Sequence, residues 1–251
     1  MVYSAQGKLF IWSFVVISPT LVYDPTASPV ARCLINAGAY LIATDHNNWF
    51  KWRSGITAPV YTDCRRLNSD AGAMATIRTA LGQSLKGNFP KAELVVGIAE
   101  AGVVWSSIVA LELGLPHAFI RKQVKAHGVS EGRVEGFPLK GAKAVIVDDL
   151  VASGDSVQEA IQILRDEAKI ETVGIQSIVN WDFHHMRERF RPLNIPLRAL
   201  VSYPQLLQEA VDQGIIGADA RNELVLFYRN PTAHQWNLEA LKPQVACKLA
   251  C

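Results

Sequence analysis

Two adjacent acids, Asp148 and Asp149, follow the short apolar segment 144–147. Neighbouring carboxylates can accept hydrogen bonds from a vicinal diol, which is the arrangement that a ribose offers. The small residues 152–156 come next, and a helix is expected to begin at about Val157. Small residues let the backbone close around oxygen-rich groups, and the free N–H groups at a helix start bind phosphate. The segment therefore predicts a binding loop for a phosphorylated ribose.

The ordinary alternative for this segment is a strand-to-helix turn capped by Asp and Ser. Such turns are common, but a paired Asp-Asp between a buried strand and a loop of Gly and Ser is not. The segment is not a Walker loop, because no Gly-Lys-Ser/Thr follows, and it lacks the Gly-x-Gly-x-x-Gly dinucleotide pattern.

A second group of polar residues follows the apolar segment 117–120. It brings four basic side chains close together, ahead of a Gly- and charge-bearing stretch to Gly136: Arg121, Lys122, Lys125 and His127. A basic run is usually a solvated face. Here a His-Gly pair and a flexible stretch follow, which favours a mobile lid over an anion.

Alternating strands and helices would position these groups. Short apolar strands are expected at 94–98, 117–120, 144–147 and 173–179, and helices at 30–37, 71–85, 104–113 and from Val157. Residues 50–66 are expected to be rich in strands, with a turn at Ser54-Gly55. This order predicts a parallel sheet covered on both faces, in which ligands bind beyond the carboxyl ends of the strands.

The composition sets limits on the class of protein. The chain has 251 residues, 49% hydrophobic and 19% charged, which suits one α/β domain with an appendage or two small domains. A net charge of +2 gives no electrostatic basis for nucleic acid as a partner. The four cysteines include no Cys-x-x-Cys pair, so reduced thiols in a cytoplasmic protein are expected.

The apolar segment 9–17 follows Lys8 and is interrupted at Pro19. It could be the core of a signal peptide, but one Lys precedes it and no convincing cleavage site follows. It is short for a membrane-spanning helix, so no membrane partner is expected. A strand or arm that packs on the body or on a partner subunit is the preferred interpretation.

These motifs together resemble a known family. The acids and small-residue loop are similar to the ribose-phosphate motif of the type I phosphoribosyltransferases. Residues 121–128 resemble the catalytic loop of the orotate phosphoribosyltransferases, Arg-Lys-x-x-Lys-x-His-Gly, at every fixed position. Residues 50–65 look like the base-binding segment of these enzymes, and residues 203–236 are similar to the tail of one bacterial branch. The resemblance covers about residues 30–236.

The resemblance implies an α/β fold of the type I phosphoribosyltransferases, a parallel sheet flanked by helices with a small N-terminal hood. It divides the chain into an apolar extension and linker (1–29), a hood and base-binding region (30–90), a phosphoribosyltransferase core (91–202) and a C-terminal helical region and tail (203–251). The implied substrates are phosphoribosyl pyrophosphate (PRPP) and orotate. Mg²⁺ would be held mainly by substrate and water. A homodimer with shared active sites is also implied, because the lid of this family reaches into the neighbouring subunit.

The resemblance also assigns residues to roles. The catalytic residues would be Lys122, Lys125 and His127, which can neutralise charge on the leaving pyrophosphate. The PRPP-binding residues would be Arg121, Lys122, Lys125, His127, Asp148, Asp149, Leu150, Val151, Ala152, Ser153, Gly154, Asp155 and Ser156. The base-binding residues would be Arg53, Ser54, Tyr61 and Ala152. The pyrophosphate loop would be Ala99, Glu100, Ala101 and Gly102.

Three departures from the family pattern concern the base side. Arg53 stands where many orotate enzymes have Lys, and Ala152 stands where a hydroxyl residue is frequent. An Asp-Arg pair often found after the next strand is replaced by residues 180–185, where His184 and His185 are expected at a surface turn or pocket rim rather than at a metal. The leading hypothesis is an orotate phosphoribosyltransferase. The alternatives are a transferase that acts on another base and a non-catalytic PRPP-sensing regulator.

Overall fold

The computed structural model describes residues 27–43, 48–52, 54–123, 132–136, 140–232, 234–237 and 241. Several predicted features lie outside these ranges: the apolar segment 9–17, Arg53, and the lid residues Lys125 and His127. Within the described part of the chain, no helix is both long enough and apolar enough to span a bilayer.

A six-stranded sheet in the order β10-β9-β8-β5-β6-β7 forms the centre of the molecule. Its strands are β5 (Leu94–Ile98), β6 (His117–Ile120), β7 (Val134–Glu135), β8 (Lys143–Val151), β9 (Glu171–Asn180) and β10 (Leu197–Ser202). All pairings are parallel except that of β6 with β7. Every residue of β5 is buried, as in a strand covered on both faces. The predicted helix-flanked parallel sheet is confirmed.

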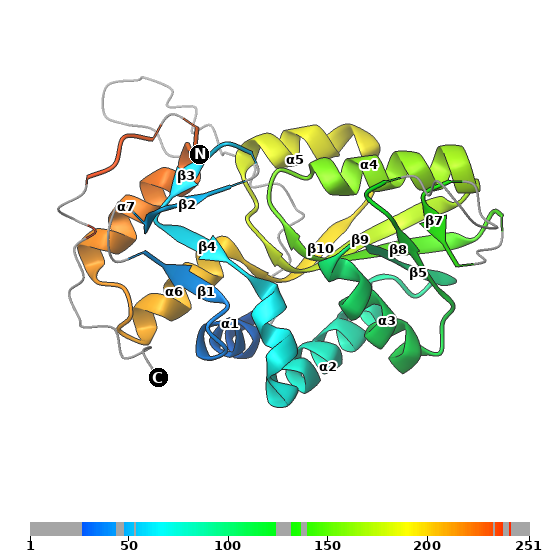
Figure 1. The fold of residues 1–251 in the computed structure, drawn as a ribbon, viewed down its shortest axis with the longest axis horizontal. Helices are drawn as coiled ribbons and strands as arrows, with labels where there is room; N and C mark the ends of the chain where they lie inside the picture. The colour runs from blue at the N-terminus through cyan, green and yellow to red at the C-terminus, as the bar shows by residue number, and fades with distance from the viewer. Residues whose placement is uncertain are drawn as a thin grey trace, which may run out of the picture.

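Helices cover both faces of this sheet (Figure 1). On one face lie α2 (Ala71–Asn88) and α3 (Ala101–Leu113), and on the other lie α4 (Asp155–Ile163) and α5 (His184–Phe190). One side of α2 is buried through Ile77, Leu81 and Leu85. Asp70 caps α2 by accepting a hydrogen bond from the backbone N–H of Ala73 at 3.0 Å. Three shorter helical turns complete this part: η2 (Cys64–Ser69), η3 (Leu164–Ala168) and η4 (Arg191–Leu193).

A second layer joins the two ends of the described chain. It contains α1 (Ala27–Asn36), β1 (Tyr40–Ile42), β2 (Phe50–Lys51), β3 (Thr57–Ala58), β4 (Val60–Thr62), α6 (Tyr203–Asp212) and α7 (Ala218–Arg229). β1 pairs with β4, and β2 with β3 through the predicted Ser54-Gly55 turn. α1 packs against α6, so blue and orange segments lie together in Figure 1. The division of the chain at residues 29, 90 and 202 stays a prediction.

Two expected boundaries near the acids were wrong. Strand β8 does not end at Val147 but continues to Val151, because residues 148–151 keep pairing with β9. Helix α4 begins at Asp155 rather than at about Val157. The connecting loop therefore contains only residues 152–154, and Asp155 and Ser156 belong to the first helical turn.

The packing of β9 on the end of α2 generates a test. A Cβ added to Gly174 would lie 2.1 Å from Cε1 of Phe89, which is itself buried. We expect Gly174→Ala to lower the free energy of unfolding by about 1–3 kcal/mol, because the buried ring must shift to make room. The matched control is Gly87→Ala, where a Cβ meets nothing within 4 Å. It should be neutral or add up to about 1 kcal/mol, because Ala favours the helix. Urea unfolding of both variants measures this, and equal stability would contradict the packing argument.

Candidate active site

A pocket of about 270 Å³ opens at the carboxyl ends of β8 and β9. Four parts of the chain form its wall: the end of β8 with the following loop and helix start, the turn after β9 with the start of α5, the β2–β4 region, and Thr232 after α7. The lining residues are Trp52, Ser54, Ile56, Tyr61, Thr62, Asp148, Leu150, Val151, Ala152, Ser153, Gly154, Asp155, Ser156, Val157, Trp181, Phe183, His185 and Thr232. The pocket thus lies where parallel sheets bind ligands.

The acid pair, Asp148 and Asp149, lies in the last part of β8, beside this pocket. Asp148 is 7% exposed and lines the pocket, whereas Asp149 is not among the lining residues. The backbone N–H of Asp149 donates to Oδ1 of Asp148 at 3.0 Å. The Cys64 thiol reaches the Asp149 carbonyl oxygen at 3.7 Å. A Cβ on Gly102 would lie 2.8 Å from Oδ1 of Asp148, so the start of α3 approaches the acid pair as only glycine allows.

Burial raises the pKa of both carboxyl groups, that of Asp148 well above its usual range. For Asp148, repulsion by the neighbouring Asp149 raises the pKa further, and nearby Lys122 opposes it. For Asp149, hydrogen bonds from Asp148 and the backbone lower the pKa in part. Burial and mutual repulsion both make the charged forms of the two carboxyl groups unfavourable. Hydroxyl donors or a cation at this position would relieve that cost.

The phosphate-loop residues 152–154 take a conformation that depends on glycine. Gly154 has φ 79° and precedes the first turn of α4, and a Cβ there would lie 2.3 Å from Cε2 of Phe190. The Ser153 hydroxyl donates to Oδ2 of Asp155 at 2.6 Å, and Arg189 pairs with the other oxygen of that carboxylate. The first N–H groups of a helix have no partner within the helix. The loop and helix start therefore present donors suited to a phosphate group.

The predicted lid leaves the sheet as an antiparallel hairpin. β6 and β7 pair through Phe119 with Glu135 and Ile120 with Val134, so the two ends of the lid lie side by side. Arg121 at the base of the lid forms an ion pair with Glu135 at 2.8 Å. The rest of the lid, residues 124–131, lies outside the described residues.

The predicted pyrophosphate loop lies beside the base of the lid. Lys122 Nζ lies 3.6 Å from Oε1 of Glu100 in that loop. The Ala99–Glu100 peptide bond is cis, and the Ala99 N–H donates to the Ile120 carbonyl at 2.9 Å. Ala101 and Gly102 open α3, with Gly102 against Asp148. None of these four loop residues lines the pocket.

The opposite side of the pocket is aromatic. Of the predicted base-binding residues, Ser54, Tyr61 and Ala152 line the pocket, and Tyr61 stacks on Phe50 with ring centroids 5.6 Å apart. Trp52, Trp181 and Phe183 also line it but were missed. Trp181 and Phe183 follow β9 directly, so the strand-end rule that pointed to the acid pair could have found them. No sequence signal marks Thr232, which follows α7.

The described residues offer few ligands for a metal ion. Among the residues that the structure describes, no group of three or more His, Cys, Asp and Glu side chains gathers in a way that could hold an ion. The acid pair offers carboxylate oxygens, the ligand type that Mg²⁺ prefers, and Mg²⁺ is usually bound by one or two carboxylates with substrate phosphates and water. The residues present therefore fit a substrate-borne magnesium ion.

Comparisons with known proteins agree with this arrangement. A family model described as the phosphoribosyl transferase domain matches residues 67–192. An orotate phosphoribosyltransferase of Bacillus anthracis is 32% identical over 207 residues, covering 82% of this chain and 97% of that protein. The Bacillus subtilis orotate phosphoribosyltransferase is 33% identical, covering 82% and 94%.

Solved structures show the same likeness. The orotate phosphoribosyltransferase from Aeropyrum pernix superposes with a TM-score of 0.63 at 26% identity, covering 72% of this chain and 98% of that one. The UMP synthase of Leishmania donovani gives a TM-score of 0.68 at 25% identity, covering 80% of this chain but 42% of that longer one. Since the family model spans half of the chain and the Bacillus relatives match along nearly their whole length, the chain belongs to the phosphoribosyltransferase family and groups with the orotate phosphoribosyltransferases.

Proposed function

We propose that this protein transfers the phosphoribosyl group of PRPP to orotate, giving orotidine 5′-monophosphate and pyrophosphate. The observation that supports this most is one pocket lined together by Asp148 of the acid pair, the phosphate loop and the aromatic residues. One end suits ribose hydroxyls and a phosphate, and the other suits a planar base. The sequence relatives carry the same activity in their names.

In this proposal a ring nitrogen of orotate attacks C1 of the ribose, and the bond from C1 to the pyrophosphate oxygen breaks with its electron pair on the leaving group. The proton of that ring nitrogen leaves to pyrophosphate or to water. The acid pair accepts hydrogen bonds from the ribose hydroxyls, and residues 152–156 bind the 5-phosphate. Lys122, Lys125 and His127 stabilise the charge that gathers on pyrophosphate. The base lies against Ser54, Tyr61 and Ala152, with Arg53 available to its carboxylate.

Three further parts of the proposal follow from family membership. Magnesium, when bound, neutralises charge on the pyrophosphate oxygens, and the acid pair is the protein group best suited to lie beside it. The lid of one protomer would reach the site of a second copy in a homodimer. The enzyme would work in the cytoplasm on small-molecule substrates, without nucleic acid or membrane partners.

The direct test combines purified protein, magnesium, PRPP and orotate, and follows the loss of orotate absorbance. We expect turnover that stops when magnesium is chelated with EDTA and returns when it is added back. Turnover with another base but not with orotate would favour a transferase of different specificity. PRPP binding without turnover on any base would favour the PRPP-sensing regulator.

The lid residues generate a second prediction. Lys125→Ala and His127→Ala should each lower kcat by about 10²-fold or more, because each removes a group that stabilises the leaving charge. The dissociation constant of ribose 5-phosphate, measured by calorimetry, should stay within about threefold of wild type, since the phosphate loop is untouched. Full activity in both variants would show that the lid assignment is wrong.

The acid pair generates a third prediction, with opposite signs for stability and activity. Burial raises the pKa of Asp148 in the folded protein, so the charged carboxylate destabilises the fold above its unfolded pKa. Asp148→Asn keeps an oxygen acceptor and removes the charge, so near neutral pH we expect Tm to rise by about 2–4 °C, the shift that ~1 kcal/mol produces at this size. The gain should shrink as the pH falls toward about 4 and should vanish below it, because the wild-type carboxyl is protonated in both states only below its unfolded pKa.

The same variant should lose turnover by about 10-fold or more, because an amide is a weaker acceptor for ribose hydroxyls than a carboxylate. Thermal unfolding between neutral and acid pH, together with the orotate assay, measures both effects. A lower Tm of Asp148→Asn near neutral pH would contradict the conclusion that the charge of Asp148 destabilises the fold.

A further inference from the structure

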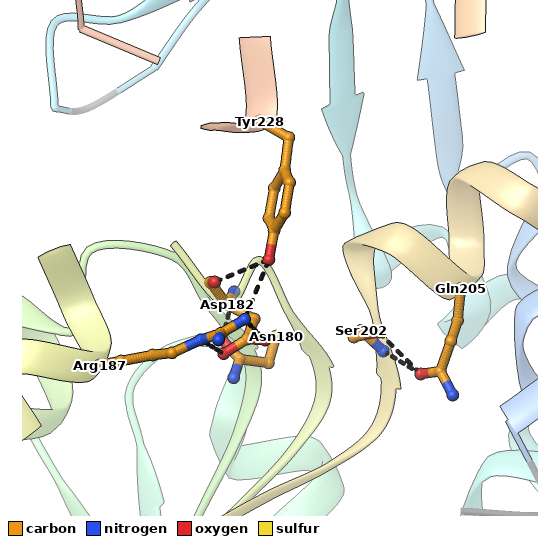
Figure 2. Close-up of polar contacts among 6 residues, drawn as sticks. All are labelled: Asn180, Asp182, Arg187, Ser202, Gln205 and Tyr228. Atoms are coloured by element: carbon orange, nitrogen blue, oxygen red, sulfur yellow. Dashed lines mark hydrogen bonds and ion pairs between the residues drawn. The ribbon is translucent and has the colours of Figure 1, made fainter. Parts of the chain in front are cut away.

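A polar cluster lies directly behind the aromatic wall of the pocket, and the proposed reaction does not use it. Asp182 stands between Trp181 and Phe183 in the turn that joins β9 to α5. Both neighbours line the pocket, whereas Asp182 does not. Its carboxylate instead accepts two hydrogen bonds from Arg187 of α5, from Nε to Oδ1 at 2.7 Å and from Nη2 to Oδ2 (Figure 2). In this turn the two aromatic residues therefore line the pocket, and the charged residue between them does not.

The backbone of the turn is held from two sides. The N–H of Asp182 donates to the side-chain oxygen of Asn180 at 2.8 Å, and Asp182 has a φ of 54°, in the left-handed region. A non-glycine residue is rare in that region and is kept there by its surroundings. Asp182 is also only 6% exposed, so its carboxylate needs a partner. The Arg187 guanidinium supplies that partner in the two-pronged geometry that suits a carboxylate.

A third contact comes from the far end of the chain. Tyr228 of α7 points toward the turn, where its hydroxyl donates to the Asp182 carbonyl at 2.9 Å and accepts from Nη2 of Arg187 at 3.2 Å (Figure 2). The Tyr228 ring also stacks on Phe183, with centroids 6.0 Å apart. One side chain therefore joins α7, the ion pair and a residue of the pocket wall.

We propose that Asp182, Arg187 and Tyr228 are positioning residues that set the base-binding half of the pocket, and thereby the affinity for orotate. This inference rests on the proposed function. None of the three lines the pocket, so they act through Trp181, Phe183 and His185. The ribose-phosphate half is built from β8, the phosphate loop and α4. Helix α5 contacts that half through Phe190 and Arg189, and not through Asp182, Arg187 or Tyr228. A disturbance of the cluster should therefore weaken the binding of the base and leave the binding of PRPP intact.

The mildest test is Tyr228→Phe, which removes one hydroxyl and two hydrogen bonds and keeps the ring on Phe183. We expect the KM for orotate to rise about threefold to tenfold, which corresponds to the net worth of one or two hydrogen bonds. The KM for PRPP and kcat should stay within about twofold of wild type. Tyr40→Phe is the matched control, because its buried ring meets Tyr203 rather than the turn. It should leave both KM values unchanged.

A second pair of variants tests the ion pair. Arg187→Gln should raise the KM for orotate more than Tyr228→Phe does, because it leaves a buried carboxylate without its cation. Arg187→Lys should fall between Arg187→Gln and wild type, since it restores the charge but not the two-pronged contact. Arg191→Gln is the control, because Arg191 is 73% exposed and pairs with Glu188 on the surface. It should change neither KM by more than about twofold.

The results of these experiments distinguish a failure of the proposed function from a failure of the positioning role. Wild-type protein that fails to convert orotate contradicts the proposed function. An active wild type, with an unchanged orotate KM in folded Tyr228→Phe and Arg187→Lys, contradicts the positioning role alone. Equal increases of both KM values contradict it as well, because they indicate a general loss of structure. Thermal unfolding of each variant shows that the protein compared is folded.

Discussion

The stacking of Trp181 on Tyr203 is the contact on which the closed shape of this protein depends. The two rings lie with centroids 3.9 Å apart and planes 14° apart, and Trp52 meets the same indole edge-on at 4.4 Å. Trp181 directly follows β9 of the central sheet, whereas Trp52 and Tyr203 belong to the layer built from the two ends of the chain. An aromatic pair contributes about 0.5–1.5 kcal/mol beyond the area it buries. The cluster joins that layer to the strand ends, and Trp52 and Trp181 also line the pocket.

Unlike the aromatic cluster, which stabilises the fold, the acid pair lowers the stability of the fold and serves binding. Two carboxylates are held side by side at the end of β8, where burial raises the pKa of each. Such an arrangement costs folding free energy, and the aromatic and aliphatic core around it must offset that cost. The same arrangement places one strong hydrogen-bond acceptor, the Asp148 carboxylate, in the wall of the pocket. Carboxyl groups that destabilise the fold in this way are typical of functional sites, where a bound ligand supplies the missing hydrogen bonds.

Close approaches of the backbone hold the ribose-phosphate side of the pocket against its neighbours. Gly102 lets α3 reach Asp148, and Gly154 lets the phosphate loop pass beneath Phe190 of α5. Helix α5 therefore touches the phosphate side through Phe190 and the aromatic side through Arg187 and Asp182. It is a short helix of seven residues, but it links both halves of the candidate site.

The sequence by itself determined the helix-flanked parallel sheet with four of its six strands, the helices α1 to α4, and the family. These features are encoded in short windows, where periodicity and residue order act locally. It misplaced the end of β8, because strand pairing with β9 and not local pattern extends that strand. Only the tertiary structure decided that Trp52, Trp181 and Tyr203 meet and that Tyr228 reaches Asp182. Such contacts depend on the strand order β10-β9-β8-β5-β6-β7 and on the packing of both chain ends, which no local window contains.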